Sequence, residues 1–258
     1  MTDQQLSSQV LSKSSKVWVV IPAAGIGQRM KSELPKQYLK IHDKTLIEHT
    51  LDCFLGHEQV AGIIVVLNPD DQDWQFLNIE SKTTPLFTVN GGSNRSDSVI
   101  QGLRCLDEEH NIPANTWVMV HDAARPCLTK TDLNALLELR EINCIGGLLA
   151  SPVTDTMKRS VNNKSSDSLK SVSHTESREN LWHALTPQMF RLGTLQKALT
   201  HSVSKRYKVT DECSAMEFMG EKPILVKSTH NNIKITNPSD IALASFLLST
   251  NNISEEEA

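Results

Sequence analysis

Residues 16–36 read KVWVVIPAAGIGQRMKSELPK. The first six are rich in β-branched side chains, which is typical of a strand buried in a sheet, and residues 22–27 end that strand in a turn. Similar apolar β runs follow at 62–67, 86–89, 117–120 and 145–150. Helical spacing separates these runs at 46–55, 70–77, 96–106 and 129–139. The alternation predicts an α/β fold with a doubly wound, mostly parallel, Rossmann-like sheet.

Three motif-like segments follow directly after these β runs, at residues 22–29, 91–98 and 121–126. In doubly wound sheets, ligands bind at the carboxyl ends of the strands. We therefore expect all three segments at the ligand-binding edge of the sheet.

Composition excludes several classes of protein. The 258 residues carry 26 basic and 30 acidic side chains, a net charge of −4, which argues against bulk attraction to nucleic acid or an anionic membrane. The longest strongly apolar run, Ala61 to Leu67, is far shorter than the roughly 20 residues that span a bilayer. The start of the chain has no apolar core typical of a secretory signal. The five cysteines form no C-x-x-C pair, which favours reduced thiols and a cytoplasmic protein.

The sequence predicts a single domain over residues 16–248, preceded by a disordered tail at 1–15 and followed by an acidic, frayed tail at 249–258. After residue 181 we expect a helix at 195–199, short strands at 224–226 and 233–235, and an apolar helix at 239–248.

The stretch 156–180 is rich in Ser, Asn and Lys and has little apolar periodicity. It predicts an excursion from the sheet in the form of a two-stranded arm, with a flexible surface loop as the alternative. An arm that cannot bury itself usually packs on another subunit, so a homodimer is the hypothesis.

The loop after the first strand has the composition of a phosphate cradle. Small residues let the backbone approach a ligand, and glycines supply N–H groups for anions. Arg29 and Lys36 could both reach a polyphosphate. A dinucleotide fingerprint would need glycine where Met30 stands, and no P-loop pattern occurs. The alternative is a tight turn with solvated cations.

The other two segments also suit a nucleotide. Gly91 and Gly92 precede a helix and could present N–H groups to a ligand, with Ser98 as a further donor, although a simple capped helix start also fits. Asp122 follows a buried strand, where a carboxylate that binds magnesium or hydroxyl groups belongs, and Arg125 could grip a second anion. A salt bridge between these two is the alternative. Asp240 could be a second metal carboxylate, but a helix N-cap is the stronger interpretation.

Taken in order, the motifs resemble one family. They are PAAGIGQRM, PKQYL, GGxxRxDSV, VHDAARP, DTMKR, LWHALTPQ, TDExSA and NIKIT. This series, from about residue 17 to 248, resembles the 2-C-methyl-D-erythritol 4-phosphate cytidylyltransferases. The resemblance implies a nucleotidyltransferase domain with a projecting β arm that builds a homodimer, and arm residues such as Thr156 and Lys158 that help complete the neighbour's site.

The resemblance also implies residue roles. The residues expected at CTP are Ala23, Ala24, Gly25, Gly27, Gly91, Ser98, Asp122 and Ala123. The residues expected in catalysis are Arg29 and Lys36, which stabilise developing charge, and Arg178 and Lys234, which aim the acceptor. The residues expected at methylerythritol phosphate are Arg125, Thr156, Thr186 and Thr210. Asp122 is also the expected ligand of Mg²⁺.

The implied reaction transfers CMP from CTP to 2-C-methyl-D-erythritol 4-phosphate and releases pyrophosphate, a step of non-mevalonate isoprenoid precursor synthesis. Three alternatives remain. They are a cytidylyltransferase for another polyol phosphate such as ribitol 5-phosphate, a sugar-1-phosphate nucleotidyltransferase, and a catalytically silent nucleotide-binding module. The joint presence of Arg29, Lys36, Asp122 and Lys234 argues against the last.

Overall fold

The computed structural model describes residues 16–25, 34–81, 83–161 and 169–256. A seven-stranded sheet with the order β11-β7-β10-β6-β1-β4-β5 forms its centre. Strand β10 runs antiparallel to both of its neighbours, and every other adjacent pair is parallel. The strands of this sheet are β1 (Val17–Pro22), β4 (Val60–Leu67), β5 (Leu86–Asn90), β6 (Trp117–Val120), β7 (Gly146–Pro152), β10 (Trp182–Arg191) and β11 (Ile224–Lys227). The prediction of a doubly wound, mostly parallel sheet is confirmed.

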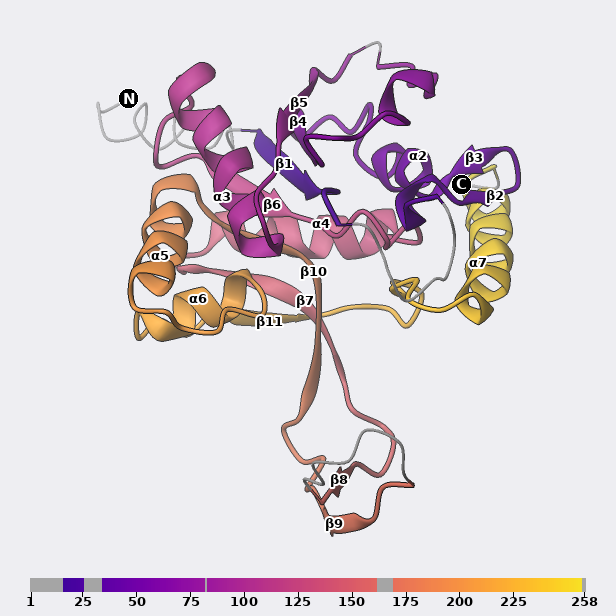
Figure 1. The fold of residues 1–258 in the computed structure, drawn as a ribbon, viewed down its shortest axis with the longest axis vertical. Coiled ribbons are helices and arrows are strands. Elements are labelled where there is room, and N and C mark those ends of the chain that lie inside the picture. The colour runs from indigo at the N-terminus through magenta and orange to yellow at the C-terminus, as the bar shows by residue number, and fades with distance from the viewer. Residues whose placement is uncertain (1–15, 26–33, 82, 162–168, 257–258) are drawn as a thin grey trace, which may run out of the picture.

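Helices cover both faces of the sheet, as Figure 1 shows. Alternate residues of β1 point to opposite faces, so that Val19 and Ile21 belong to one apolar cluster and Val20 to the other. Helices α2 (Leu46–Asp52) and α4 (Lys130–Leu137) bury their apolar faces in the first cluster. The second cluster is completed by α3 (Arg95–Arg104), α5 (Leu192–Ser204) and α6 (Glu212–Phe218).

A third, smaller apolar cluster forms beside the sheet. Helix α7 (Ser239–Glu256) packs there near the two-stranded hairpin of β2 (Lys40–Ile41) and β3 (Lys44–Thr45). Short turns of helix complete the described chain: η2 (Lys36–Tyr38), η3 (Trp74–Phe76), η4 (Cys105–Glu109) and η5 (Glu138–Glu141). In the described part of the chain, no helix is both long enough and apolar enough to cross a membrane.

The predicted arm is present. Strands β7 and β10 lead out of the body to a small antiparallel pair, β8 (Lys158–Ser160) and β9 (Val172–Thr175), which projects away from the sheet (Figure 1). Every residue of β8 and β9 is exposed in this single chain. These two strands of the arm therefore bury no side chain against the rest of the described chain.

Several local expectations were wrong. Residues 70–77 form only the short turn η3, because Asp71 accepts hydrogen bonds from the backbone N–H groups of Asp73 and Trp74 (3.0 Å each) and so competes with a helix. Residues 233–235 belong to no strand, since Ile235 N–H is bonded to the Ala124 carbonyl (2.9 Å) in the loop after β6.

The end of the chain also differs from the expectation. Helix α7 continues to Glu256, so most of the stretch expected to be a frayed tail is helical. Strand β10 and helix α6 had no counterpart among the predicted elements. The tail at residues 1–15 lies outside the described residues.

Candidate active site

A cavity of about 390 Å³ opens at the carboxyl ends of β1, β4 and β6, beside the N-terminus of α3. All three segments expected at this edge contribute to it. Its lining consists of Pro22, Ala23, Ala24, Gly25, Lys36, Gln37, Asn68, Gly92, Ser93, Asn94, Arg95, Ser98, Asp122, Ala123, Ala124 and Lys234. Small residues and cations therefore line the same cavity, which is what a polyphosphate ligand needs.

The start of the small-residue loop is held by its neighbours. Ala23 N–H donates to the Val66 carbonyl (2.8 Å), and the buried side chain of Gln37 donates to the Ala23 carbonyl (2.8 Å). Because Gln37 follows Lys36 in η2, the same contact brings Lys36 to the cavity. Gly27 and Arg29, which we expected at the phosphates, lie outside the described residues.

The loop before α3 comes close to the first loop. Gly91 N–H donates to the Leu67 carbonyl (2.7 Å), and a Cβ at position 91 would lie only 2.7 Å from the Ala24 Cβ and 2.8 Å from the Ser98 Oγ. Glycine is therefore required for this close approach. Ser98 Oγ accepts from Gly92 N–H (3.2 Å) at the cavity wall. Asn94 caps α3, so the loop is a capped helix start and a cavity wall at once.

Asp122 is the centre of the charged network. Arg95 Nε donates to its Oδ1 (3.0 Å), and Lys234 Nζ donates to its Oδ2 (2.7 Å). Arg125 Nε lies 3.7 Å from the same Oδ2, so the salt bridge that we gave as the alternative role of these two residues is also present. Burial acts to raise the pKa of Asp122, but the positive charges of Arg95 and Lys234 lower it more. The pKa of this carboxyl group therefore lies well below its usual range, and the group stays ionised.

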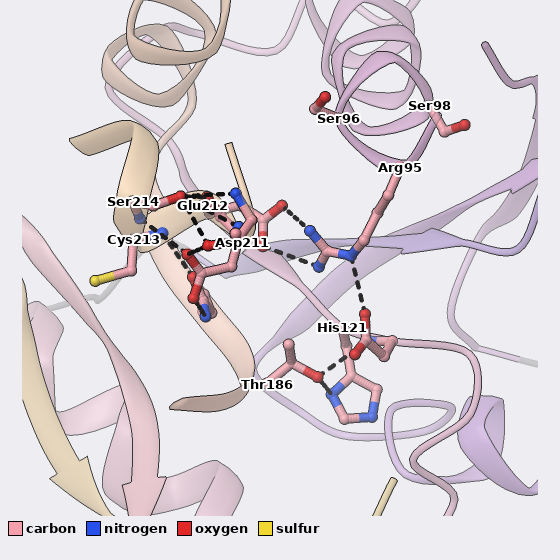
Figure 2. A network of polar contacts seen from close by, with 12 residues as sticks. Arg95, Ser96, Ser98, His121, Thr186, Asp211, Glu212, Cys213 and Ser214 are labelled. Carbon is pink, nitrogen blue, oxygen red and sulfur yellow. Dashed lines mark hydrogen bonds and ion pairs between the residues drawn. The ribbon is translucent and has the colours of Figure 1, made fainter. Parts of the chain in front are cut away.

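A second layer of side chains supports the loop that carries Asp122. Asp122 N–H donates to Thr186 Oγ1 (3.1 Å). The same oxygen contacts His121 Nδ1 (3.2 Å), and Figure 2 shows Thr186 beside the His121 ring. His121 Nε2 lies 3.0 Å from the Arg125 carbonyl. A carbonyl can only accept, so we assign the ring proton to Nε2 and the Thr186 hydroxyl proton to the bond with Nδ1. Both ring nitrogens are thus used within the protein.

Because the imidazole of His121 is buried, we expect the stability of the fold to depend on pH. Burial lowers the pKa of His121 to about 4. Between about pH 6.5 and pH 4 the unfolded chain binds a proton that the folded chain does not, so stability falls as pH falls through this window, by up to roughly 3 kcal/mol. Chemical denaturation across this range measures it. His121→Gln should flatten the slope, whereas His230→Gln, at an exposed position, should leave it unchanged.

Thr186 and Arg125 are buried and are not among the described lining residues of the cavity. Arg125 Nη1 donates to the Asn232 carbonyl (2.7 Å), and Asn232 Nδ2 donates to the Thr186 carbonyl (2.7 Å). Arg125 Nε and Asn232 Oδ1 are buried without a hydrogen-bond partner among the described residues. These contacts hold the loop after β6 against the segment before α7.

The remaining expected residues are not at this cavity in the described chain. Thr156 and Arg178 are exposed on the arm, where Arg178 contacts the Thr154 carbonyl. Lys158, also on the arm, donates to Thr175 Oγ1 (2.6 Å). Thr210 lines a neighbouring hollow that shares Asn94 and Arg95 with the cavity. The described chain therefore places most of the residues expected at the nucleotide at one cavity, but not all of those expected at the acceptor.

Sequence reasoning missed two charged residues of the site. Arg95 Nη1 and Nη2 donate to the two carboxylate oxygens of Glu212 (2.7 and 3.0 Å), which joins α3 to α6 (Figure 2). Because Arg95 also bonds Asp122, this link lies beside the Asp122 carboxylate. Both lie inside quoted motifs, Arg95 in GGxxR and Glu212 in TDE. An acid and an arginine in separate ligand-edge motifs are the signal that could have found the pair.

Asp122 is the one carboxylate among the described lining residues, and the described chain contains no group of three His, Cys, Asp or Glu that could hold a metal ion. Asp240, our weaker metal candidate, instead accepts from the backbone N–H groups of Thr236 and Asn237 (2.8 Å each) and caps the approach to α7. A divalent ion at this site would need most of its ligands from a bound substrate.

Comparison with known proteins identifies the family. The family model for 2-C-methyl-D-erythritol 4-phosphate cytidylyltransferase matches residues 17–250. The chain belongs to the 2-C-methyl-D-erythritol 4-phosphate cytidylyltransferase family. A family member from Photorhabdus laumondii is 46% identical over 249 residues, which cover 95% of this chain and 99% of that protein. Another, from Pseudoalteromonas atlantica, is 50% identical over 230 residues, with 89% and 94% covered.

A solved structure of this family has the same fold. The crystal structure of the Francisella tularensis 2-C-methyl-D-erythritol 4-phosphate cytidylyltransferase superposes with a TM-score of 0.74 at 35% identity, covering 90% of this chain and all of that one. The resemblance of the eight sequence motifs to this cytidylyltransferase family is confirmed. As a member, the chain is an enzyme of the nucleotidyltransferase class.

Proposed function

We propose that this cytidylyltransferase moves CMP from CTP to 2-C-methyl-D-erythritol 4-phosphate, giving 4-diphosphocytidyl-2-C-methyl-D-erythritol and pyrophosphate. We infer the reaction from membership of the family. The observation that supports this reaction in this chain is the cavity. There Gly91 lets two loops pack closely together, and Lys36, Arg95 and Lys234 line the space beside them. Such a site suits two polyanions that must be brought together.

The chemistry needs no general base. The second pKa of a phosphate monoester is near ~6, so the attacking phosphate oxygen is already mostly ionised at neutral pH. His121 supports this assignment because its ring nitrogens are both engaged and its pKa is lowered by burial. The barrier lies in repulsion between substrates and in charge growth on the α-phosphate and the leaving pyrophosphate. Fixed cations lower that barrier by electrostatic preorganisation.

The site residues keep the roles that we proposed. CTP is held by Ala23, Ala24, Gly25, Gly27, Gly91, Ser98, Asp122 and Ala123. Arg29 and Lys36 stabilise the developing charge, and Arg178 and Lys234 aim the acceptor phosphate. The acceptor is held by Arg125, Thr156, Thr186 and Thr210. For Thr186 and Arg125 the support is indirect, since both shape the loop that carries Asp122.

The site suits a Mg²⁺ ion that binds together with the nucleotide. Asp122 offers a carboxylate at the cavity, and Mg²⁺ in such sites commonly takes one or two carboxylates and completes its shell with phosphate oxygens and water. Lys234 occupies one Asp122 oxygen, so it would give way where the ion binds. When bound, the ion supplies further positive charge at the transferring phosphates.

A homodimer through the arm is part of the proposal, together with a single domain over residues 16–248 and a cytoplasmic location. The fully exposed strands β8 and β9 support the dimer, because an isolated two-stranded pair is marginally stable in water. Light scattering at micromolar concentration should give twice the chain mass of 28.7 kDa. A monomeric mass would contradict the dimer but would leave the reaction untouched.

Pyrophosphate release tests the function. The purified protein, CTP and Mg²⁺ are assayed in parallel with methylerythritol phosphate and with ribitol 5-phosphate. Turnover with the first acceptor alone is expected. Turnover with the second alone would replace the acceptor and keep the nucleotide half. CTP binding without pyrophosphate release from either would revive the silent nucleotide-binding module.

A further inference from the structure

We propose that Glu212 is a positioning residue for the transfer reaction, acting through Arg95 to fix the Asp122 carboxylate at the cavity. The inference rests on the proposed function. Glu212 is the first residue of α6, and its relative exposure is 0%. It is absent from the described lining of the cavity, so any influence on substrates passes through another side chain.

Arg95 is that side chain. Its Nη1 and Nη2 donate to the two Glu212 oxygens at 2.7 and 3.0 Å, and its Nε donates to Asp122 Oδ1 at 3.0 Å. Two parallel bonds to one carboxylate fix the plane of a guanidinium group. With that plane fixed, the direction of the Nε–H bond toward Asp122 is fixed as well.

Glu212 itself is held firmly. The N-cap residue Asp211 accepts from Ser214 N–H (2.9 Å) and from Gln188 Nε2 (2.9 Å), while Gln188 Oε1 accepts from Cys213 N–H (2.7 Å). The start of α6 is thereby tied to strand β10 on both sides of Glu212. The carboxylate is a fixed support rather than a mobile charge.

The pairing also decides which cation is free to meet a substrate. Arg95 lines the cavity, and a guanidinium group with unused N–H groups binds phosphate readily. Glu212 accepts one N–H from each Nη group while the Nε–H bonds Asp122, so Arg95 is held in place between two carboxylates. Lys234 differs, because within the described chain its side chain forms a hydrogen bond and an ion pair with Asp122 alone. Arg95 therefore orients the carboxylate, and Lys234 remains able to turn toward a phosphate.

A double-mutant cycle tests the proposal. Wild type, Glu212→Gln, Arg95→Gln and the double variant are assayed for pyrophosphate release with CTP and methylerythritol phosphate. We expect each single change to lower kcat about tenfold or more, with the KM for CTP in Glu212→Gln within about threefold of wild type. The double variant should be no slower than Arg95→Gln alone, because residues that act as one unit are not additive.

Two further variants separate positioning from folding. Glu217→Gln changes an exposed carboxylate on the same helix and should keep the wild-type kcat. Arg95→Lys keeps the charge but loses the fork, so its kcat should fall as far as that of Arg95→Gln; this comparison decides the matter if Glu212→Gln does not fold. Wild-type kcat in Glu212→Gln or Arg95→Lys, or losses that multiply in the double variant, would overturn the inference. A silent wild type would count against the proposed function instead.

Discussion

Asp122→Asn should lower kcat by about 10²- to 10³-fold, the range typical of removing one preorganised electrostatic group from an active site. The side chain receives bonds from Arg95 and Lys234 at once and lines the cavity. An amide cannot accept both bonds with full charge, and its NH₂ group would face one of the cations. Pyrophosphate release at saturating CTP and acceptor measures the loss.

The same change should also destabilise the fold. The loss should be smaller than the about 3–5 kcal/mol typical of breaking a buried ion pair, because Arg95 keeps its bonds to Glu212 and the Lys234 side chain is 37% exposed. Asp132→Asn is the matched control. Asp132 is another buried carboxylate, bonded to Ser228 Oγ (2.7 Å) and to Thr229 N–H (2.8 Å), which follow the edge strand β11 and are not among the described lining residues of the cavity. It should lower the unfolding midpoint while the folded protein keeps its kcat. Wild-type turnover by Asp122→Asn would remove Asp122 from the mechanism.

Lys36→Ala is expected to have the second large effect, a fall in kcat of about 10²-fold or more. Lys36 reaches the cavity from η2, and Gln37 fixes its position by the bond to the Ala23 carbonyl (2.8 Å). The lost charge is one that faces the developing negative charge of the transferring phosphate. Steady-state kinetics with both substrates varied should place most of the loss in kcat.

Lys40→Ala provides the comparison for Lys36. It removes an exposed lysine four residues further on, in β2, and should leave kcat unchanged. Arg29→Ala should lower kcat as Lys36→Ala does, since we propose that both residues stabilise the negative charge that develops on the transferring phosphate. A Lys36→Ala enzyme with normal kcat and a raised KM for CTP would make Lys36 a ground-state binding residue only.

The sheet and the cavity could be predicted because local patterns determine them. β-Branched runs such as the one in β1 specify buried parallel strands, and parallel strands bring the loops that follow them to one edge. The structure places Lys36, Ser98 and Asp122 in the lining of one cavity, whereas their roles stay a prediction. The antiparallel strand β10 escaped prediction because it contains Pro187 and because Thr186 and Gln188 interrupt its buried half with polar side chains.

Long-range pairing could not be predicted from local patterns. Arg95 and Glu212 are 117 residues apart in the chain, and only the packing of α6 beside α3 makes them partners. The support of Asp122 by Thr186 likewise depends on how β10 registers against β6, where Gln188 pairs with Val120. Spacing in one sequence carries no record of such registers.

The way the arm joins the body has a consequence for engineering. Pro152 pairs with Trp182 at the top of the β7–β10 ladder, and Val153 N–H donates to the Leu181 carbonyl (2.9 Å). The chain thus leaves and re-enters the body at neighbouring points, about 5 Å apart across an antiparallel ladder. Topologically the arm is an insertion into a hairpin, which a short turn can close without rethreading any strand. A body trimmed in this way would contain the nucleotide cavity but lack Thr156 and Arg178, and so would isolate what the arm adds.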